Sequence, residues 1–218
     1  MKDSILILSG GVDSVTMLYD YQDRISMALS FDYGSNHNQR ELPFAALHCK
    51  RLGIAHRVVK LDFMSQILNS SLLEGADAVP EGSYAEKNMR STVVPFRNGV
   101  MLSVAVAMAE NEGLSHVMMA NHGGDHSVYP DCRPDFVDAF SRAAEAGTYA
   151  KVTLVAPYTN WTKTQIVARG KQLGIDYAET WSCYKGLEYH CGRCATCLER
   201  RQALADAGVE DNTVYLSE

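Results

Sequence analysis

Short apolar runs alternate along the chain with segments that have helical periodicity. Five runs of Ile, Val, Leu, Phe and Met residues have the length of strands and contain few charged residues, a pattern that is typical of strands covered on both faces. These predicted strands span residues 5–8, 25–31, 56–61, 117–120 and 152–156.

The segments between these runs carry apolar residues three and four positions apart, as amphipathic helices do. Helices are predicted after Ser14, over 41–52, 98–112 and 134–147, and after Thr162. Thr162 and Gln165 have the spacing of a capping box, and Gly174 is placed to end that helix. The alternation predicts an α/β fold with a doubly wound parallel sheet, in which ligands bind where the strand order reverses.

Composition narrows the class of protein. The chain has 218 residues, of which 46% are hydrophobic, enough for one domain with a full core. Its formal net charge of −6 argues against a nucleic-acid partner, because phosphate binding usually needs a basic face. The sequence has no uninterrupted apolar run long enough for a membrane span, and its first apolar run is too short for a signal peptide. We therefore expect a cytoplasmic protein.

One segment lacks periodicity. Residues 74–92 are polar without a regular pattern. A loop of this length in a compact domain is a lid, a binding loop or a disordered segment.

A glycine-rich segment joins the first predicted strand to the first predicted helix. Two glycines there let backbone N–H groups approach an anion, and the helix N-terminus adds its positive dipole end. The segment is not a Walker A motif, which requires Gly-Lys-Ser/Thr after four spacers; it resembles the PP-loop of the N-type ATP pyrophosphatases. The expected ATP-binding residues are Leu8, Ser9, Gly10, Gly11, Val12, Asp13, Ser14 and Val15.

Two charged residues belong to this interpretation. Asp13 is unusual beside phosphate, so it positions the loop, caps the helix or holds Mg²⁺. Lys163 stands in the first turn of a predicted helix, where a cation opposes the helix dipole. It is either a solvated surface lysine or a phosphate contact, and PP-loop enzymes have a lysine at a similar place that neutralises phosphates. We expect Asp13, Ser14 and Lys163 to act in catalysis.

Four of the six cysteines lie near the C-terminus: Cys183, Cys191, Cys194 and Cys197. In a cytosolic chain such a group indicates a metal site. Four thiolates complete a tetrahedral Zn²⁺ and leave no position for water, so the site is expected to be structural. An iron–sulfur cluster is the main alternative, and a redox dithiol is less favoured because it needs only one pair.

The glycine-rich segment and the four cysteines, taken with four further stretches of sequence, resemble the 7-cyano-7-deazaguanine synthase (QueC) family. The resemblance covers nearly the whole chain. The family usually has Gln-Arg where this chain has Ser35-Asn36, which leaves the fine substrate contacts open. The matching stretches are Phe31-Asp32-Tyr33-Gly34, Val94-Pro95-Phe96-Arg97-Asn98, Tyr129-Pro130-Asp131-Cys132-Arg133-Pro134 and Thr180-Trp181-Ser182-Cys183-Tyr184, followed by the three later cysteines.

The resemblance implies an ATP-dependent ligase that converts 7-carboxy-7-deazaguanine and ammonia to the nitrile through an adenylylated acid and an amide. It implies a Rossmann-like domain of the adenine nucleotide alpha hydrolase type over 1–178 and a zinc-binding helical segment over 179–218. ATP, structural Zn²⁺ and Mg²⁺ are the expected cofactors. A homodimer is expected from the family, without nucleic acid or membrane.

Further site residues follow from their positions. Tyr33, at the end of the second strand, is expected near the adenine, or is an ordinary half-buried aromatic residue. Arg97 and Asn98 precede a buried helix and are expected to hold substrate or phosphate, with Arg97 also catalytic. Asp131 and Arg133 could read a guanine-like edge, or could form a local ion pair. A metal-ligand role for His122 and His126 is not favoured, because glycines separate them.

Three other functions stay open at this stage. The first is a PP-loop enzyme that thiolates tRNA, with the cysteines carrying sulfur or an iron–sulfur cluster. The second is a non-enzymatic zinc knuckle with a small basic patch of Arg193, Arg200 and Arg201; for these arginines the solvated face of a helix running on from Cys197 is the favoured interpretation. The third is a family member that stops at the amide or attaches a deazaguanine to a protein.

Overall fold

Five parallel strands form a single sheet in the described part of the chain. The computed structural model describes residues 2–83 and 87–216. The strand order is β3-β2-β1-β4-β5. Every predicted strand is present, with bounds that shift by at most two residues: β1 Ser4–Ile7, β2 Ile25–Asp32, β3 Ala55–Lys60, β4 His116–Met118 and β5 Thr153–Val155.

The strand order reverses between β1 and β4. The chain first builds outward from β1 through β2 to β3, and then returns to place β4 on the other side of β1. This confirms the predicted doubly wound sheet. The crevice at the carboxyl ends of β1 and β4 is therefore the expected ligand site, and the glycine-rich segment follows β1 directly.

The helices lie where the periodicity predicted them. The helix over 134–147 has the predicted bounds, and the helix predicted from residue 41 begins three residues earlier. The helices are α1 Val12–Asp20, α2 Asn38–Leu52, α3 Phe63–Ile67, α4 Arg97–Asn111, α5 Pro134–Gly147, α6 Lys163–Gln172 and α7 Ala195–Asp206, with 3-10 turns η1 Lys87–Thr92, η2 Gly123–Ser127, η3 Pro130–Cys132 and η4 Tyr177–Glu179.

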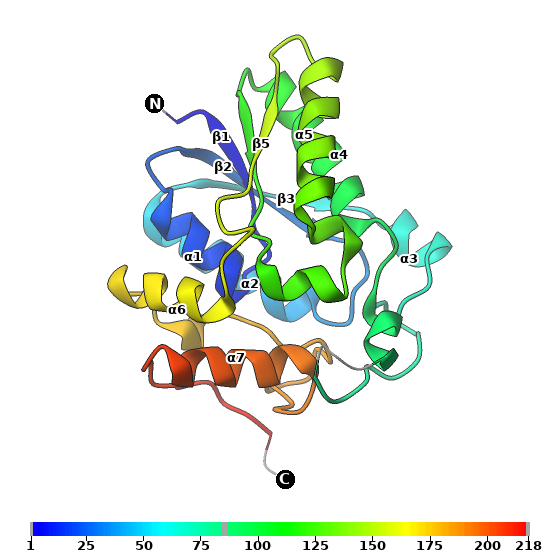
Figure 1. Cartoon of the computed structure of the whole chain (residues 1–218), viewed down its shortest axis with the longest axis vertical. Coiled ribbons are helices and arrows are strands. Elements are labelled where there is room, and N and C mark those ends of the chain that lie inside the picture. Colours follow the sequence, from blue (N-terminus) through cyan, green and yellow to red (C-terminus); the bar gives the residue numbers. More distant parts are fainter. Residues whose placement is uncertain (1, 84–86, 217–218) are drawn as a thin grey trace.

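Alternate residues of the strands point to two separate cores. Ile5 and Leu29 belong to the core that α4 and α5 cover, whereas Leu6 and Ala28 belong to the core that α1, α2 and α6 cover. Helix α7 packs beside α6 and adds Leu204 to the second core. Figure 1 shows α4 and α5 on one side of the sheet and α1, α6 and α7 on the other.

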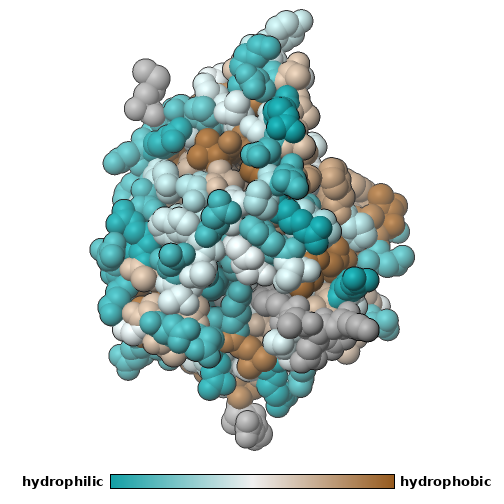
Figure 2. Space-filling view, viewed as in Figure 1, coloured by the Kyte–Doolittle hydropathy of each residue, from teal (hydrophilic) through white to brown (hydrophobic). Residues whose placement is uncertain are grey.

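Helix α4 is apolar on most of its surface. Residues Met89–Asn111 have the length and composition of a membrane span. In the structure, however, α4 packs against β1 and β4, and Met101, Leu102 and Ala105 are buried there. These contacts are those of a core helix. Figure 2 shows polar side chains over much of one face of the molecule, with apolar groups in separate patches.

The predicted loop over 74–92 contacts the C-terminal segment. Residues 84–86 lie outside the described residues. Among the others, Glu81 pairs with Cys194 in an isolated bridge, and its carboxylate accepts a hydrogen bond from Lys185 Nζ at 2.6 Å. The loop therefore lies against the cysteine-rich segment.

Candidate active site

The glycine-rich segment wraps around the side chain of Ser14. Its Oγ accepts hydrogen bonds from the backbone N–H groups of Ser9 at 3.2 Å and Gly10 at 3.3 Å. Gly10 has φ +100°, and a Cβ there would lie 2.3 Å from the carbonyl oxygen of Glu41, so the turn accepts only glycine. Gly11 precedes α1 and no side chain caps that helix. The first turn of α1 is thus an open anion site.

This segment opens onto a cavity of about 210 Å³ at the strand-order reversal. The loop after β1 forms one part of its wall. The other parts come from the end of β2, the start of α2, the start of α4 and the C-terminal segment. Predicted site residues that line it are Leu8, Ser9, Gly11, Val12, Asp13, Ser14, Tyr33, Arg97, Asn98 and Lys163.

Lys163 lies among three carboxylates instead of in solvent. Its Nζ donates a hydrogen bond to Asp13 Oδ2 at 2.5 Å and lies 3.6 Å from Glu199 Oε2. Burial lowers the pKa of Lys163, but Asp13, Glu199 and Asp125 outweigh burial and raise that pKa above its ordinary value. The lysine is therefore charged, and the unfavourable helix dipole is offset by neighbours that the sequence did not reveal.

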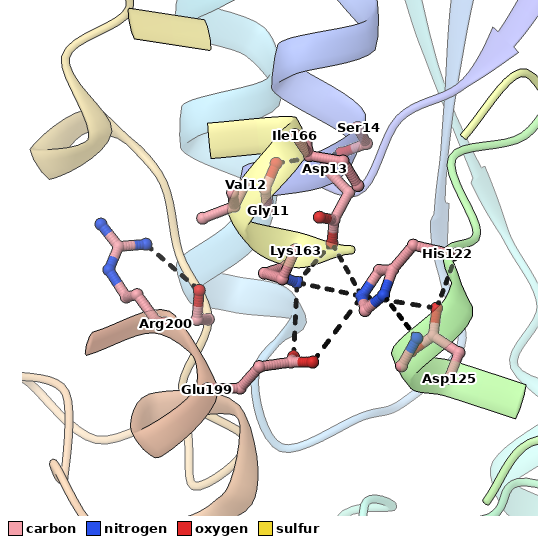
Figure 3. Close-up of polar contacts among 12 residues, drawn as sticks. Gly11, Val12, Asp13, Ser14, His122, Asp125, Lys163, Ile166, Glu199 and Arg200 are labelled. Atoms are coloured by element: carbon pink, nitrogen blue, oxygen red, sulfur yellow. Dashed lines mark hydrogen bonds and ion pairs between the residues drawn. The ribbon is translucent and has the colours of Figure 1, made fainter. Parts of the chain in front are cut away.

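His122 stands at the centre of the same group (Figure 3). Its Nδ1 accepts the backbone N–H of Gly124 at 3.1 Å, and its Nε2 lies 3.5 Å from Nζ of Lys163. Nε2 faces Asp125 at 3.7 Å, Asp13 at 3.9 Å and Glu199 at 4.0 Å. Glu199 and this role of His122 were not predictable from the sequence, because no local pattern connects them to Lys163.

Arg97 provides a partly buried positive charge elsewhere in the cavity. Its Nη1 donates a hydrogen bond to Tyr33 Oη at 3.3 Å. No carboxylate in the described part of the chain lies within ion-pair distance of its guanidinium. Phe96, at the N-cap of α4, has φ +54°, and this strained residue turns the chain immediately before Arg97. A guanidinium that lines a cavity without a carboxylate partner suits an anionic ligand.

The residues predicted to read a guanine-like edge lie elsewhere. Asp131 Oδ2 accepts the backbone N–H of Asn98 at 2.9 Å, so this carboxylate serves the start of α4, and it does not line the cavity. Arg133 is exposed, and its Nε donates to the carbonyl of His126 at 2.9 Å. The structure brings Asn98 to the cavity but not Asp131 or Arg133; Glu41 and His37 line it instead.

The Ser35-Asn36 departure from the family pattern does not face the cavity. Asn36 Nδ2 donates to the carbonyl of Ser71 at 2.9 Å, and a Cβ on Gly186 would collide with the carbonyl of Asn36. Asn38, which does line the cavity, accepts the N–H groups of Tyr33 and Ser35, each at 3.1 Å. Ser35 and Asn36 therefore shape the loop and its contact with the C-terminal segment.

The four C-terminal cysteines converge in the structure. Cys183, Cys191, Cys194 and Cys197 are all buried, and their Sγ atoms lie within 4.8 Å of one another. Backbone N–H groups of Cys191 and Cys194 donate to cluster sulfurs, each at 3.3 Å. Four thiolates on one tetrahedral ion with bonds of about 2.3 Å would be about 3.8 Å apart. The donor set thus fits a single metal ion.

The cysteine segment holds one wall of the cavity. The backbone N–H of Trp181 donates to the carbonyl of Gly10 at 3.0 Å. Arg200 donates to Thr180 Oγ1 at 2.8 Å and to Ser182 Oγ at 3.1 Å, which fixes the same stretch to α7. The expectation that Arg200 belongs to a solvated basic face is therefore wrong: it is 1% exposed, because its donors satisfy this buried turn.

Comparisons with known proteins agree with this geometry. The pattern of the family described as "Queuosine biosynthesis protein QueC" matches residues 3–208. A protein of Porphyromonas gingivalis named 7-cyano-7-deazaguanine synthase is 56% identical over 214 residues, 98% of this chain and 97% of its own length. One of the same name from Desulfotalea psychrophila is 47% identical over 218 residues, 99% of this chain and 100% of its own length.

Solved structures share the fold at low identity. An NMN synthetase from Francisella tularensis matches with a TM-score of 0.51 and 12% identity, over 96% of this chain and 78% of its own. The U34-tRNA thiolase NcsA from Methanococcus maripaludis, solved with a 4Fe–4S cluster, matches with a TM-score of 0.50 and 15% identity, over 84% of this chain and 61% of its own. The family match and the two named relatives show family membership as well as fold. The chain belongs to the QueC family of queuosine biosynthesis enzymes, the 7-cyano-7-deazaguanine synthases.

Proposed function

We propose that this chain converts 7-carboxy-7-deazaguanine and ammonia to 7-cyano-7-deazaguanine at the expense of ATP. The observation that carries the proposal is the joint placement of the open N-terminus of α1, Lys163 and Arg97 around one cavity; Arg97 has no carboxylate within ion-pair distance among the described residues. A nucleotide triphosphate and a second anion can meet there. Membership of the family supplies the identity of the second anion.

The reaction needs two activations. A carboxylate oxygen attacks the α-phosphorus of ATP, pyrophosphate leaves, and the acyl adenylate forms. Ammonia attacks the acyl carbon, AMP leaves with the former carboxylate oxygen, and a proton is released, giving the amide. The amide oxygen attacks a second ATP in the same way. Loss of AMP, which takes the amide oxygen, and of both N–H protons of the amide then leaves the C≡N bond, so each nitrile consumes two ATP.

The PP-loop residues have distinct parts in this proposal. The N–H groups at the start of α1 and the Lys163 ammonium group stabilise charge on the departing pyrophosphate. Asp13 holds Lys163 in place through the 2.5 Å hydrogen bond, and Ser14 holds the loop through its Oγ. Leu8 and Val15 form the apolar ends of the ATP-binding stretch, and Tyr33 lies beside the nucleotide through its place at the end of β2.

Arg97 is proposed to bind the carboxylate of the base. A guanidinium forms two parallel hydrogen bonds with a carboxylate, which fixes the oxygen that attacks phosphorus. Asn98 supports this position: its amide donates to the carbonyl of Asp131 at 3.3 Å and to Cys132 Sγ at 3.2 Å. Asp131 acts on the site through the start of α4 and through its negative charge, which helps to raise the pKa of Arg97. We assign no direct contact to Arg133.

Two metal ions fit residues of this chain. Zn²⁺ is proposed in the four-cysteine cluster, where it stabilises the fold and takes no part in the chemistry. The carboxylates of Asp13 and Asp125 suit Mg²⁺, which would neutralise phosphate charge when it is bound with ATP. Asp13 Oδ1 is buried without a hydrogen-bond partner among the described residues, which is consistent with that assignment.

The tRNA-thiolase alternative is disfavoured by the cysteine geometry. In a four-iron cluster each cysteine binds a different iron atom, so the sulfurs would have to stand farther apart than around one ion. Here they lie within 4.8 Å of one another. We therefore infer a single metal ion. Free ammonia as the nitrogen donor and a small base instead of tRNA as the substrate are proposed from membership of the family. A cytoplasmic homodimer remains part of this proposal.

The test is a product assay on the purified protein. Incubation with ATP, ammonium and 7-carboxy-7-deazaguanine should give the nitrile by mass spectrometry, with the amide as a transient species. Nucleotide analysis should show two AMP and two pyrophosphate per nitrile. Accumulation of the amide alone would favour the altered-product alternative, and absence of both products would refute the proposal. Metal analysis should give one zinc per chain without acid-labile sulfide.

A further inference from the structure

The cavity contains a carboxyl group without a hydrogen-bond partner among the described residues. This is Glu41, in the first turn of α2. Its side chain is 14% exposed and lines the cavity. His37 lies beside it, but its Nε2 is 3.7 Å from Glu41 Oε2, too far for a hydrogen bond.

His37 does not neutralise this carboxyl group. Burial, with a further contribution from Arg97, lowers the pKa of His37 to about 3, so its ring is neutral near pH 7. Burial also raises the pKa of Glu41 to about 8, against the opposing effect of Arg97. The Glu41 carboxyl group is thus partly removed from water, and it finds no hydrogen-bond donors among the described residues. Such a group is costly unless a ligand supplies them.

We propose that Glu41 is the residue that recognises the base, through two hydrogen bonds from the N1–H and 2-amino groups of a guanine-type edge. The inference rests on the proposed function and deepens it, because it assigns the specificity of the same cavity. The two oxygens of an ionised carboxylate accept side by side, and a guanine-type edge offers two adjacent N–H donors in one plane. Donors from the bound base favour this ionised form over the protonated form that burial favours in the free protein. Adenine offers one donor beside an acceptor nitrogen, which would face a carboxylate lone pair.

The position of Glu41 suits this role. Its backbone carbonyl lies so close to Gly10 that a Cβ there would come within 2.3 Å of it. A base held by Glu41 therefore lies beside the loop that binds the nucleotide. The donor edge and the 7-carboxylate point toward opposite ends of the fused ring, and Arg97 in the same cavity can receive the carboxylate. Asp131, the carboxylate expected from the sequence, is occupied at the start of α4.

The experiment compares two bases in the wild-type protein and in Glu41→Gln. The second base is the analogue of 7-carboxy-7-deazaguanine that lacks only the 2-amino group. Wild type should prefer the natural base by at least tenfold in kcat/KM. In Glu41→Gln the KM for the natural base should rise at least tenfold, the preference should fall below twofold, and the KM for ATP should stay within twofold.

Each other outcome overturns the inference. If the wild-type protein uses both bases equally, no residue recognises the 2-amino group. This result is obtained with wild type alone, so it does not depend on whether the variant folds. A variant that keeps the wild-type preference removes Glu41 from recognition. A rise in the KM for ATP alone assigns Glu41 to adenine. Failure of the proposed function is a separate result, since wild type would then form neither amide nor nitrile from the natural base.

Discussion

The ammonium group of Lys163 donates a hydrogen bond to Oδ2 of Asp13 at 2.5 Å and thereby joins the first turn of α6 to the first turn of α1. A second ion pair joins the same two helices: Arg169 Nη2 lies 2.5 Å from Asp20 Oδ1. Each pair links a cation of α6 to a carboxylate of α1, but only the residues of the first pair line the cavity. The first is therefore assigned to phosphate chemistry and the second to packing.

Asp13→Ala is expected to reduce turnover at least about 100-fold, a loss of about 2.7 kcal/mol in transition-state stabilisation. Without Asp13, Lys163 keeps Glu199 as its near carboxylate at 3.6 Å and moves away from the phosphate position. Steady-state kinetics of nitrile formation would measure this loss. Circular dichroism should show an intact fold.

Asp20→Asn is the matched control. It removes the corresponding pair at the far end of the same helices and should leave kcat and the KM for ATP within about twofold. Activity of Asp13→Ala within tenfold of wild type, or an equal loss in Asp20→Asn, would show that the assignment of the loop is wrong.

Arg97→Met should raise the KM for the base about 100-fold, with a smaller effect on the KM for ATP. The variant removes a charge-assisted pair of hydrogen-bond donors from the cavity, for which about 2.7 kcal/mol is a reasonable loss. Arg133→Met is the informative comparison, because the sequence placed both arginines in the site and the structure leaves Arg133 exposed. Equal losses in both variants would contradict the assigned cavity.

These arginines show how far the sequence reaches. The type of each element was predictable because periodicity depends on neighbouring residues. The strands and the bounds of α5 followed from it. The capping box also followed from local spacing, and the structure has the hydrogen bond from Gln165 N–H to Thr162 Oγ1 at 3.2 Å. The loop at Ser9–Ser14 and the cysteines were also local signals. The division at residue 178 stays a prediction.

The missed contacts are those between distant segments. Glu199 reaches Lys163 from α7, and Arg200 on the next position turns inward to Thr180. Neither interaction has a spacing rule, because both depend on how α7 packs against α6. The chemistry of Asp131 suits a guanine-like edge, but its carboxylate accepts a hydrogen bond from the backbone N–H of Asn98 instead. Which polar group stays unpaired in the cavity is a property of the whole fold.

Cys194→Ser should lose the metal and destabilise the fold. A structural metal ion contributes binding free energy directly to folding, so we expect a loss of at least about 3 kcal/mol, or a fall in Tm of roughly 10 °C for a chain of this size. Cys49→Ala is the control: Cys49 is also buried, but it packs among apolar residues of the other core. It should keep one metal per chain. A metal-free, stable and inactive Cys194→Ser would instead indicate a catalytic cysteine.

Glu41→Gln should make the protein more stable, relative to wild type, as pH rises. The folded-state pKa of Glu41 is about 8 against an ordinary value of 4.5, chiefly because of burial. A raised folded pKa means that its contribution to stability is fully present below 4.5 and is lost as pH rises through 8. At pH 7 this loss is on the order of 3 kcal/mol relative to acid. The glutamine side chain of the variant does not titrate, so the variant avoids this loss.

Urea unfolding of the metal-loaded protein between pH 5 and pH 8 measures this difference. The free energy of unfolding of Glu41→Gln minus that of wild type should increase steadily across the range. The pKa of His37 falls from 6.5 in the unfolded chain to about 3 in the folded protein. This change is the same in both proteins, so its contribution to stability cancels in the subtraction. Glu145→Gln, at an exposed position of α5, should give a flat difference. A flat difference for Glu41→Gln as well would mean that Glu41 finds hydrogen-bond donors in the free protein. The carboxyl group would then have no unpaired oxygens to offer the base, and the proposed recognition by Glu41 would be contradicted.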